Sequence, residues 1–231
     1  MKEYLNKIHQ GDCLEFMKQL PDNCIDLIIA DPPYGIDYQS AWRTDKTEWK
    51  PKIANDSKPF VSWIYDAHRV LKDGGRMICF YRWDVQQEFL SEIKTMGLNV
   101  KSQIVWDKIS HGMGDLRGEF APQHESIIYA TKGRYEFQTK RPTTIIQCMR
   151  VTPDKLLHPN EKSTVLIKKL IKTLSVKSDI IFDPFMGSGT TAVAAYQIGR
   201  RWFGCEISEE YCKIANKRIE HEMDNLFEDV K

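Results

Sequence analysis

The 231-residue chain lacks the long hydrophobic runs that a membrane span requires. No apolar run approaches the ~20 residues of a membrane-spanning helix, and the opening MKEYLNKIHQ contains no apolar signal core. The six cysteines are scattered without a CxxC pair, so neither a disulfide framework nor a zinc site is indicated. We therefore expect a cytoplasmic protein with reduced, mostly buried thiols, no metal and no membrane contact.

The sequence also has little net charge, but the charge is unevenly spread. The formal net charge is +1. Residues 132–172 contain ten Lys and Arg against three acids, whereas residues 206–231 contain eight acids against four bases. This distribution favours one face that binds a polyanion over a uniformly basic protein, although the lysines at 168, 169 and 172 also fit a solvated helix face.

Strand and helix patterns alternate along the chain, whose length fits one domain. Helical periodicity covers 58–75, 84–97 and 163–174, and another helix is expected from Thr190 or Thr191. This alternation predicts an α/β fold with a mostly parallel sheet and helices on both faces. Stretches 39–54, 111–122 and 133–160 do not follow the pattern. The predicted strands are 24–30, 76–81, 100–106, 125–130, 179–182 and 201–205.

The segment DLIIADPPY reads as a buried strand that two prolines end abruptly. The prolines fix two φ angles and restrict Asp31 before them to extended geometry. Asp31 and Tyr34 are therefore held at the end of a strand, where open α/β sheets bind ligands. A rigid turn with an exposed acid is the alternative interpretation.

The segment DIIFDPFMGSGTT predicts a second site, because a strand leads through a glycine-rich turn into a helix. The next strand ends at Glu206, where an acid is placed to hold ribose hydroxyls. The turn has neither GxGxxG nor GxxxxGK[ST], and Asp183 stands where it would repel a pyrophosphate. A ligand with a ribose and a positive charge fits better, as in S-adenosylmethionine. Glycines that serve only tight packing are the alternative.

With both segments read, the chain resembles the DNA amino-methyltransferases, which methylate adenine N6 or cytosine N4. The resemblance covers nearly the whole chain. DPPY precedes DPFMGSGTT by about 150 residues, in the permuted β-type order of that family. It implies a single Rossmann-like, S-adenosylmethionine-dependent catalytic domain over 1–231. A polar insertion is expected at about 39–58 and a short target-recognition region at about 131–160.

The chemistry of such a reaction explains the first motif. An exocyclic amine on an aromatic ring is a poor nucleophile, because its lone pair is delocalised into the ring. The Asp31 carboxylate and the Pro32 carbonyl would accept its N–H hydrogens and direct the lone pair at the methyl donor. Tyr34 would stack on the flipped base. Asp31, Pro32, Pro33 and Tyr34 are thus the expected catalytic residues.

The resemblance also implies which residues form the cofactor site. Asp12 and Cys13 match a position that meets the adenine of the cofactor, although a helix-capping Asp and a core thiol fit these residues equally. His158 and Lys162 match an HPxxKP element that borders the cofactor's carboxylate, with Ser163 in place of the usual proline. The expected cofactor-binding residues are Asp12, Cys13, Asp31, His158, Lys162, Asp183, Phe185, Gly187, Gly189, Thr190 and Glu206.

DNA is the expected partner. The basic stretch from Arg134 to Arg150 and the insertion WRTDKTEWK would contact phosphates, and Trp42 and Trp49 would wedge, stack or simply pack. No separate large recognition domain is evident in the sequence, so a brief recognition site or a homodimer follows as a hypothesis. Both restriction–modification and stand-alone roles stay open.

Several alternatives remain at this point. DPPY is the form more usual among adenine methylators, which favours adenine N6 over cytosine N4. RNA or protein amides would suit the same arrangement of groups, although the basic loop favours nucleic acid. A catalytically inactive nucleic-acid-binding relative is a further alternative. The chain has no Pro-Cys dipeptide, so methylation of a ring carbon is not supported.

Overall fold

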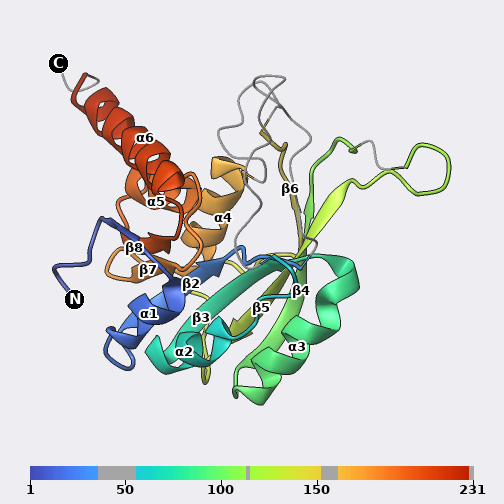
Figure 1. The fold of residues 1–231 in the computed structure, drawn as a ribbon, viewed down its shortest axis with the longest axis horizontal. Coiled ribbons are helices and arrows are strands. Elements are labelled where there is room, and N and C mark those ends of the chain that lie inside the picture. The colour runs from blue at the N-terminus through green and yellow to red at the C-terminus, as the bar shows by residue number, and fades with distance from the viewer. Residues whose placement is uncertain (36–55, 113–114, 152–160, 229–231) are drawn as a thin grey trace.

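A computed structural model describes residues 1–35, 56–112, 115–151 and 161–228 (Figure 1). The strands of this part form a single eight-stranded sheet in the order β1-β8-β7-β2-β3-β5-β4-β6. Among them only β5 runs antiparallel to its neighbours, β3 and β4. The strands are β1 (Ile8–Gln10), β2 (Ile25–Ala30), β3 (Leu71–Tyr81), β4 (Asn99–Asp107), β5 (His124–Thr131), β6 (Ile145–Gln147), β7 (Ile180–Asp183) and β8 (Arg201–Glu206).

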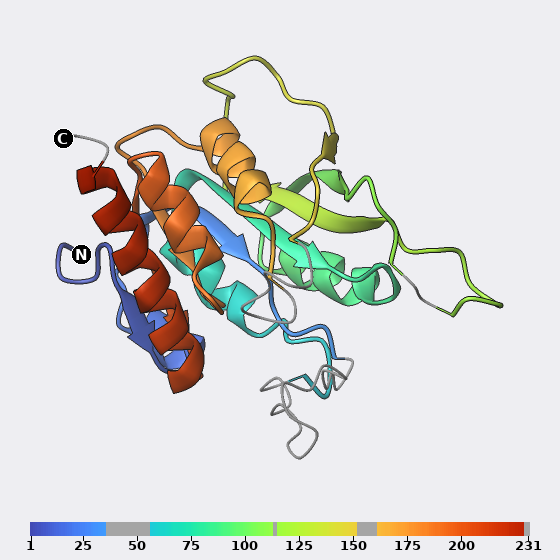
Figure 2. The same ribbon diagram turned by 90° about the horizontal axis from the view of Figure 1, so that it is seen from above.

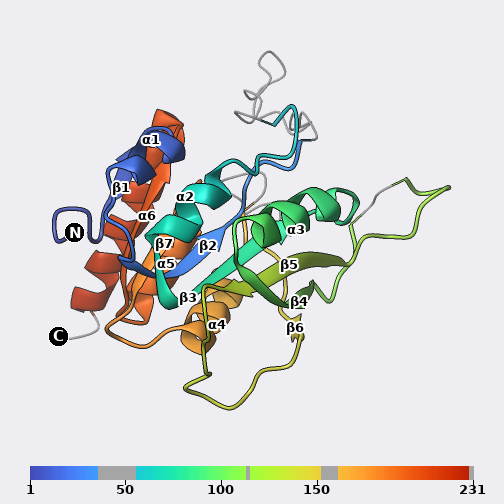
Figure 3. The same cartoon turned by 90° about the horizontal axis from the view of Figure 1, so that it is seen from below.

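Helices cover both faces of the sheet. One face carries α1 (Cys13–Lys18), α2 (Trp63–Val70) and α3 (Gln86–Thr95), which lie in front in Figure 3. The other face carries α4 (Thr164–Leu174), α5 (Thr190–Gln197) and α6 (Glu209–Glu228), which lie in front in Figure 2. A short 3₁₀ helix, η1 (Trp83–Val85), precedes α3. The expected α/β architecture with helices on both faces is confirmed.

The apolar run in β2 is continuous because this strand is buried on both sides. Successive side chains point to opposite faces of a strand. Ile28 and Ala30 accordingly pack under the helices α1–α3, whereas Leu27 and Ile29 pack under α4 and α5. A strand with one face in water would instead alternate apolar and polar residues. The sequence pattern thus placed β2 in the interior of the sheet.

The six predicted strands are all present, and two strands were missed. Both missed strands, β1 and β6, contain three residues and lie at the two edges of the sheet. The helix predicted over 58–75 is shorter than expected: α2 ends at Val70, and β3 begins at Leu71, before the glycine pair at 74 and 75. The predicted insertion lies almost wholly outside the described residues.

All strands except β5 end at the same edge of the sheet, which we call the carboxyl edge. Because β5 is antiparallel, it begins there: Ser126, near its start, pairs with Tyr81 at the end of β3. Thr131, its last residue, pairs with Arg76 toward the opposite edge. The connection between β4 and β5 projects from the body of the protein at the carboxyl edge (Figures 1 and 2).

The six cysteines are all buried and unbonded, as expected of reduced thiols. Within the described ranges, no helix combines the length and the hydropathy of a membrane span.

An internal ion pair joins the two halves of the sheet at the edge opposite the carboxyl edge. The buried guanidinium of Arg76 contacts the carboxylate of Asp179 and donates from Nε to the Leu174 carbonyl at 2.7 Å. The same group stacks on the Tyr135 ring, 4.5 Å from its centroid. One side chain of β3 therefore ties together the end of α4, the start of β7 and the segment after β5.

Arg76→Met should lower the free energy of unfolding by about 3 kcal/mol, because it leaves the mostly buried Asp179 carboxylate, 13% exposed, without its cation. Urea denaturation would measure the change. The matched control is Arg82→Met, whose partly exposed pair with Asp84 should be worth about 1 kcal/mol or less. Equal losses in the two variants would show that the internal pair has no special role.

Candidate active site

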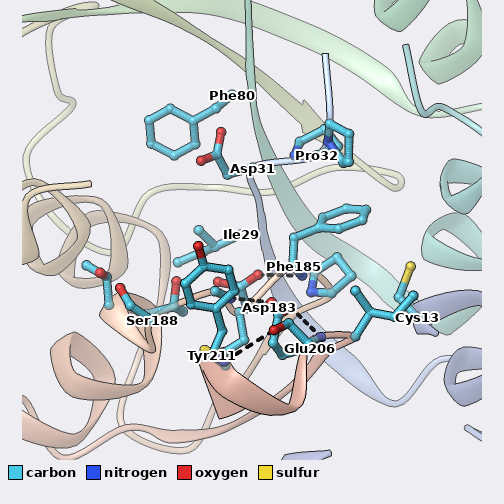
Figure 4. Close-up of a pocket in the computed structure, with 18 of the residues that line it drawn as sticks. Cys13, Ile29, Asp31, Pro32, Phe80, Asp183, Phe185, Ser188, Glu206 and Tyr211 are labelled. Carbon is cyan, nitrogen blue, oxygen red and sulfur yellow. Dashed lines mark hydrogen bonds between the residues drawn. The ribbon is translucent and has the colours of Figure 1, made fainter. Parts of the chain in front are cut away.

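A cleft of about 420 Å³ opens at the carboxyl edge, between the turns that follow β2 and β7 (Figure 4). This volume lies in the range of small-molecule sites, roughly 300–1,000 Å³. The two strands are parallel neighbours, with Leu27 beside Ile181 and Ile28 beside Phe182. Their terminal acids, Asp31 and Asp183, therefore line the same cleft. This shared cleft is the arrangement that the two sequence motifs required.

The turn after β2 is held by bonds to residues 56–60. The Pro33 carbonyl accepts from the Phe60 amide at 3.1 Å, and the Gly35 amide donates to Asp56 Oδ1 at 2.8 Å. Gly35 has φ +82°, and a Cβ there would lie 2.4 Å from Lys58 and Pro59 backbone atoms. Only glycine fits this position, so the chain must turn sharply after Tyr34.

Both oxygens of the Asp31 carboxylate have partners. The Tyr34 hydroxyl donates to Oδ1, and the Lys162 ammonium lies 2.8 Å from Oδ2. This hydroxyl contact holds the Tyr34 ring beside the carboxylate, and stacking of the ring on a base stays a prediction. Burial and the neighbouring Asp31 charge raise the pKa of Tyr34 well above its usual value, so the phenol stays a hydrogen-bond donor.

A chain of alternating charges continues from Asp31 into the protein. Lys162 also contacts Glu125 Oε2 at 3.2 Å, and Lys108 contacts Glu125 Oε1 at 2.8 Å. Burial opposes the charge of Lys162, yet Asp31 and Glu125 outweigh it and raise the pKa of this ammonium. Burial likewise opposes the charge of Glu125, while Lys162 and Lys108 lower its pKa. Lys162 and Glu125 are therefore both ionised near neutral pH.

The turn after β7 presents two more carboxylates to the cleft. Asp183 accepts from the Phe185 amide at 2.8 Å, and its burial raises the pKa to about 7. Glu206, at the end of β8, accepts from the amides of Gly187 at 2.7 Å and Ser208 at 2.9 Å. Burial raises the pKa of Glu206 as well, against these backbone bonds. The cleft is therefore unsuited to an anion.

The two glycines of the motif have different environments. Both have positive φ, +54° at Gly187 and +87° at Gly189. A Cβ at Gly187 would meet nothing closer than 4.0 Å, so this backbone leaves room for a ligand. A Cβ at Gly189 would lie 2.8 Å from the Ala215 Cβ, because α5 and α6 pack closely there. Gly189 is not among the residues that line the cleft, and its approach to Ala215 shows that it has at least a packing role.

Asp12 has the helix-capping role that was left open. Its Oδ1 accepts from the Leu14 amide at 2.7 Å at the start of α1. Asp12 and the adjacent thiol of Cys13 nevertheless line the cleft beyond β1. Burial raises the pKa of Cys13 to about 12, so the thiol stays neutral.

Of the expected site residues, His158, Trp42 and Trp49 fall outside the described part of the chain. Gly189 is the one described member that does not line the cleft. The expected residues that line it together are Asp12, Cys13, Asp31, Pro32, Pro33, Tyr34, Lys162, Asp183, Phe185, Gly187, Thr190 and Glu206.

Sequence reasoning missed Tyr211 and Glu125. Tyr211 lines the cleft from the first turn of α6, and only its place three residues after Ser208 hinted at this. Glu125 reaches Lys162 because β5 is antiparallel, and no local signal distinguishes that direction. Within the described ranges, no group of three or more His, Cys, Asp and Glu side chains could hold a metal ion.

The basic stretch after β5 is divided between the two edges of the sheet. The Lys132 ammonium donates to the carbonyls of His68 and Leu71, so it caps the end of α2. Arg134 lies beside Gly74, at the edge opposite the carboxyl edge. The chain then returns along β6, and the Cys148 amide donates to the Asp107 carbonyl at the carboxyl edge.

Comparisons with known proteins match nearly the whole chain. YubD of Escherichia coli (strain K12) is 31% identical over 220 residues, 93% of this chain and 90% of that protein. The crystal structure of the M1.HpyAVI–SAM complex matches with a TM-score of 0.70 at 24% identity, over 92% of this chain and 98% of that one. The cytosine-N4-specific PvuII DNA methyltransferase matches with a TM-score of 0.73 at 17% identity, over 94% and 89%. The family model for N6/N4 DNA methylases matches residues 25–217, and the chain belongs to this family of DNA methylases.

Proposed function

We propose that this DNA methylase moves the methyl group of S-adenosylmethionine to the exocyclic amine of a flipped base, and that the amine is adenine N6. The observation that carries the proposal is the shared cleft, in which Asp31 faces the site from β2 while Asp183 and Glu206 face it from β7 and β8. One side of the cleft is thus suited to an amine and the other to a cationic nucleoside.

The donor set fits S-adenosylmethionine. The Glu206 carboxylate, fixed by two backbone amides, is suited to accept hydrogen bonds from ribose hydroxyls. The Asp183 carboxylate suits an ammonium or sulfonium, and Gly187 leaves space for close approach. Asp12, Cys13 and Ile207 also line the cleft and would contact the adenine ring of the cofactor. The M1.HpyAVI complex, which has the same fold, contains this compound according to its name.

When bound, the cofactor supplies an electrophilic methyl group on a sulfonium. Asp31 would accept one N–H of the target amine and Pro32 would accept the other through its carbonyl. These bonds turn the nitrogen lone pair toward the methyl group and stabilise the positive charge that develops on nitrogen. In the transfer, a nitrogen–carbon bond would replace the sulfur–carbon bond of the cofactor, and the proton that the nitrogen loses would pass to the Asp31 carboxylate or to water.

Adenine N6 is favoured by the DPPY form of the motif, which the family resemblance associates with adenine. Cytosine N4 is the second candidate, because PvuII methyltransferase, cytosine-N4-specific by name, has the same fold. The arrangement of Asp31 and the prolines is compatible with either amine, since both are attached to an aromatic ring. A homodimer stays a prediction.

DNA engaged at the cleft would lie along the carboxyl edge. Arg150 follows β6 at this edge, whereas Arg134 lies at the opposite edge. The exposed side chains Trp83, Leu116 and Phe120 also lie on connections at the carboxyl edge. We therefore propose that DNA contacts the C-terminal end of the basic stretch, near Arg150, and not the end near Arg134. The recognition region would then be shorter than the expected 131–160.

The direct test is to treat unmethylated genomic DNA with the protein and S-adenosylmethionine and to sequence it by a method that reports modified bases. N6-methyladenine in a short fixed context is the expected result. N4-methylcytosine would favour the second candidate, and unmodified DNA would contradict the proposal. DNA treated without the cofactor is the control.

Asp31→Ala should reduce methyl transfer by about 100- to 1,000-fold, because one preorganised group that stabilises the developing charge is lost. The dissociation constant of S-adenosylmethionine, measured by equilibrium dialysis, should change little. Asp84→Ala, which removes a carboxylate beyond β3, is the matched control and should leave both quantities unchanged. Parallel loss of transfer and cofactor binding in Asp31→Ala would make Asp31 a structural residue.

Glu206→Ala should weaken cofactor binding about tenfold or more, because hydrogen bonds to a charged group contribute about 1.5–3 kcal/mol. The variant also removes the acceptor of the Gly187 and Ser208 amides, so Glu206→Gln is the conservative comparison. Isothermal titration calorimetry would measure both. An unchanged dissociation constant would remove Glu206 from the binding site.

Cofactor affinity should rise with pH through the titration of Asp183. Because burial raises this pKa to about 7, the carboxyl is mostly neutral at pH 6 and mostly ionised at pH 7.5. An ionised carboxylate attracts the cationic cofactor, so the dissociation constant should fall by up to about eightfold over this range. The neighbouring carboxylates of Asp31 and Glu206 also act on Asp183, and they are unchanged in the variant Asp183→Asn. Asp183→Asn should flatten the profile, and a profile unchanged by this substitution would contradict the assignment.

A further inference from the structure

We infer that Lys162 is a positioning residue that orients the Asp31 carboxylate for the target amine, and that Glu125 holds Lys162 in place from the other side. The inference rests on the proposed function, since it concerns the same carboxylate. It departs from the family resemblance, which puts this lysine at the carboxylate of the cofactor.

The Asp31 carboxylate needs a partner to define its plane. The two prolines after it restrict the backbone, and the buried strand β2 fixes where its Cα lies. Neither constraint reaches the carboxylate itself, because the torsion about the Cβ–Cγ bond is broad and roughly two-fold. An acceptor that must direct a nitrogen lone pair requires a defined plane, so the orientation must come from side-chain contacts.

Lys162 and Tyr34 supply these contacts from opposite sides. The ammonium lies 2.8 Å from Oδ2, and the Tyr34 hydroxyl donates to Oδ1. Two donors on two different oxygens fix the rotation of the carboxylate. The lone pairs that remain on these oxygens are available to an amine in the cleft, because a carboxylate can accept about four hydrogen bonds.

The lysine is itself held on three sides. Its side chain is 10% exposed, and Glu125 Oε2 lies 3.2 Å from the ammonium. The ammonium stands over the Phe80 ring, 5.1 Å from the centroid. The preceding residue, Glu161, is paired with Arg218 of α6 at 2.9 Å, so the backbone before α4 is anchored as well. A lysine with these contacts cannot swing freely toward another ligand.

The charges balance along this network. Lys108 and Lys162 carry two positive charges, and Asp31 and Glu125 carry two negative charges. The other titratable groups that face Asp31 are Tyr34, Cys79 of β3 and Asp183. Because the Lys162 ammonium is bound by Glu125 as well as by Asp31, it is held in one place as a hydrogen-bond donor to Asp31. Glu125 therefore reaches Asp31 through its contact with Lys162.

The test compares Lys162→Met, Lys162→Arg, Glu125→Gln and the double variant Lys162→Met with Glu125→Gln. For each, the single-turnover rate of methyl transfer from tritiated S-adenosylmethionine to unmethylated phage DNA is measured, together with the dissociation constant of the cofactor. Lys213→Met is the matched control, because it removes an exposed lysine from a Lys–Glu pair on α6. Thermal unfolding followed by circular dichroism reports whether each variant is folded.

Lys162→Met should slow transfer about 100-fold, as expected for a misplaced reacting group. Its cofactor dissociation constant should stay within about threefold of wild type, and Lys162→Arg should recover about tenfold of the rate, since it keeps the charge. Glu125→Gln should slow transfer about tenfold, and the double variant should be no slower than Lys162→Met, because both residues act in one chain. A merely structural role would not produce this non-additivity.

Three outcomes would overturn the inference. Unaltered transfer in Lys162→Met would show that Lys162 has no role in positioning. If Lys162→Met lost cofactor affinity to the same extent as the rate of methyl transfer, Lys162 would be a cofactor-binding residue instead. If Lys162→Met does not fold, Glu125→Gln and Lys162→Arg carry the test, and wild-type rates in both would contradict it. An inactive wild-type protein would reject the proposed function itself, which separates the two failures.

Discussion

The parallel pairing of β2 and β7 is the constraint on which the rest of the structure depends. Two strands far apart in the sequence lie side by side with the same direction, so the acids at their ends meet at one edge of the sheet. This pairing needs strands that are apolar on both faces, because helices cover each side. Ile28 and Phe182 satisfy that need, since both are fully buried. The site is therefore a consequence of how the interior of the sheet is built.

The antiparallel strand β5 brings its first residues, rather than its last, to the carboxyl edge. A parallel strand in its place would begin at the far edge, and its first side chains would lie a strand length from the cleft. Because β5 runs the other way, Glu125 near its start stands behind Lys162. The Lys162 side chain approaches from the segment before α4, on the other side of the cleft. Three chain segments therefore meet at one carboxylate.

Much of this arrangement could be predicted from the sequence, and the rest depends on contacts that no local pattern encodes. The buried strands and both turns were identified because apolar runs, prolines and glycines act locally. The two edge strands were missed because three residues are too few for a recognisable period. Gly187 and Gly189 look alike in sequence, yet only Ala215 on α6 decides that one is a packing residue. The basic stretch was similarly ambiguous, because the capping of α2 by Lys132 depends on residues about sixty positions away.

The hydrogen bond from Tyr34 to Asp31 has a consequence for how a base enters. A bare carboxylate in a half-closed cleft would hold water, and an arriving amine would have to strip that water away. Here a phenol already occupies one oxygen, so folding has already removed part of its hydration shell. A nucleobase amine at Asp31 would use the lone pairs that Tyr34 and Lys162 leave free, and it would meet an oxygen that has already lost part of its water. The fold would thus pay part of the dehydration cost of base binding before any base arrives.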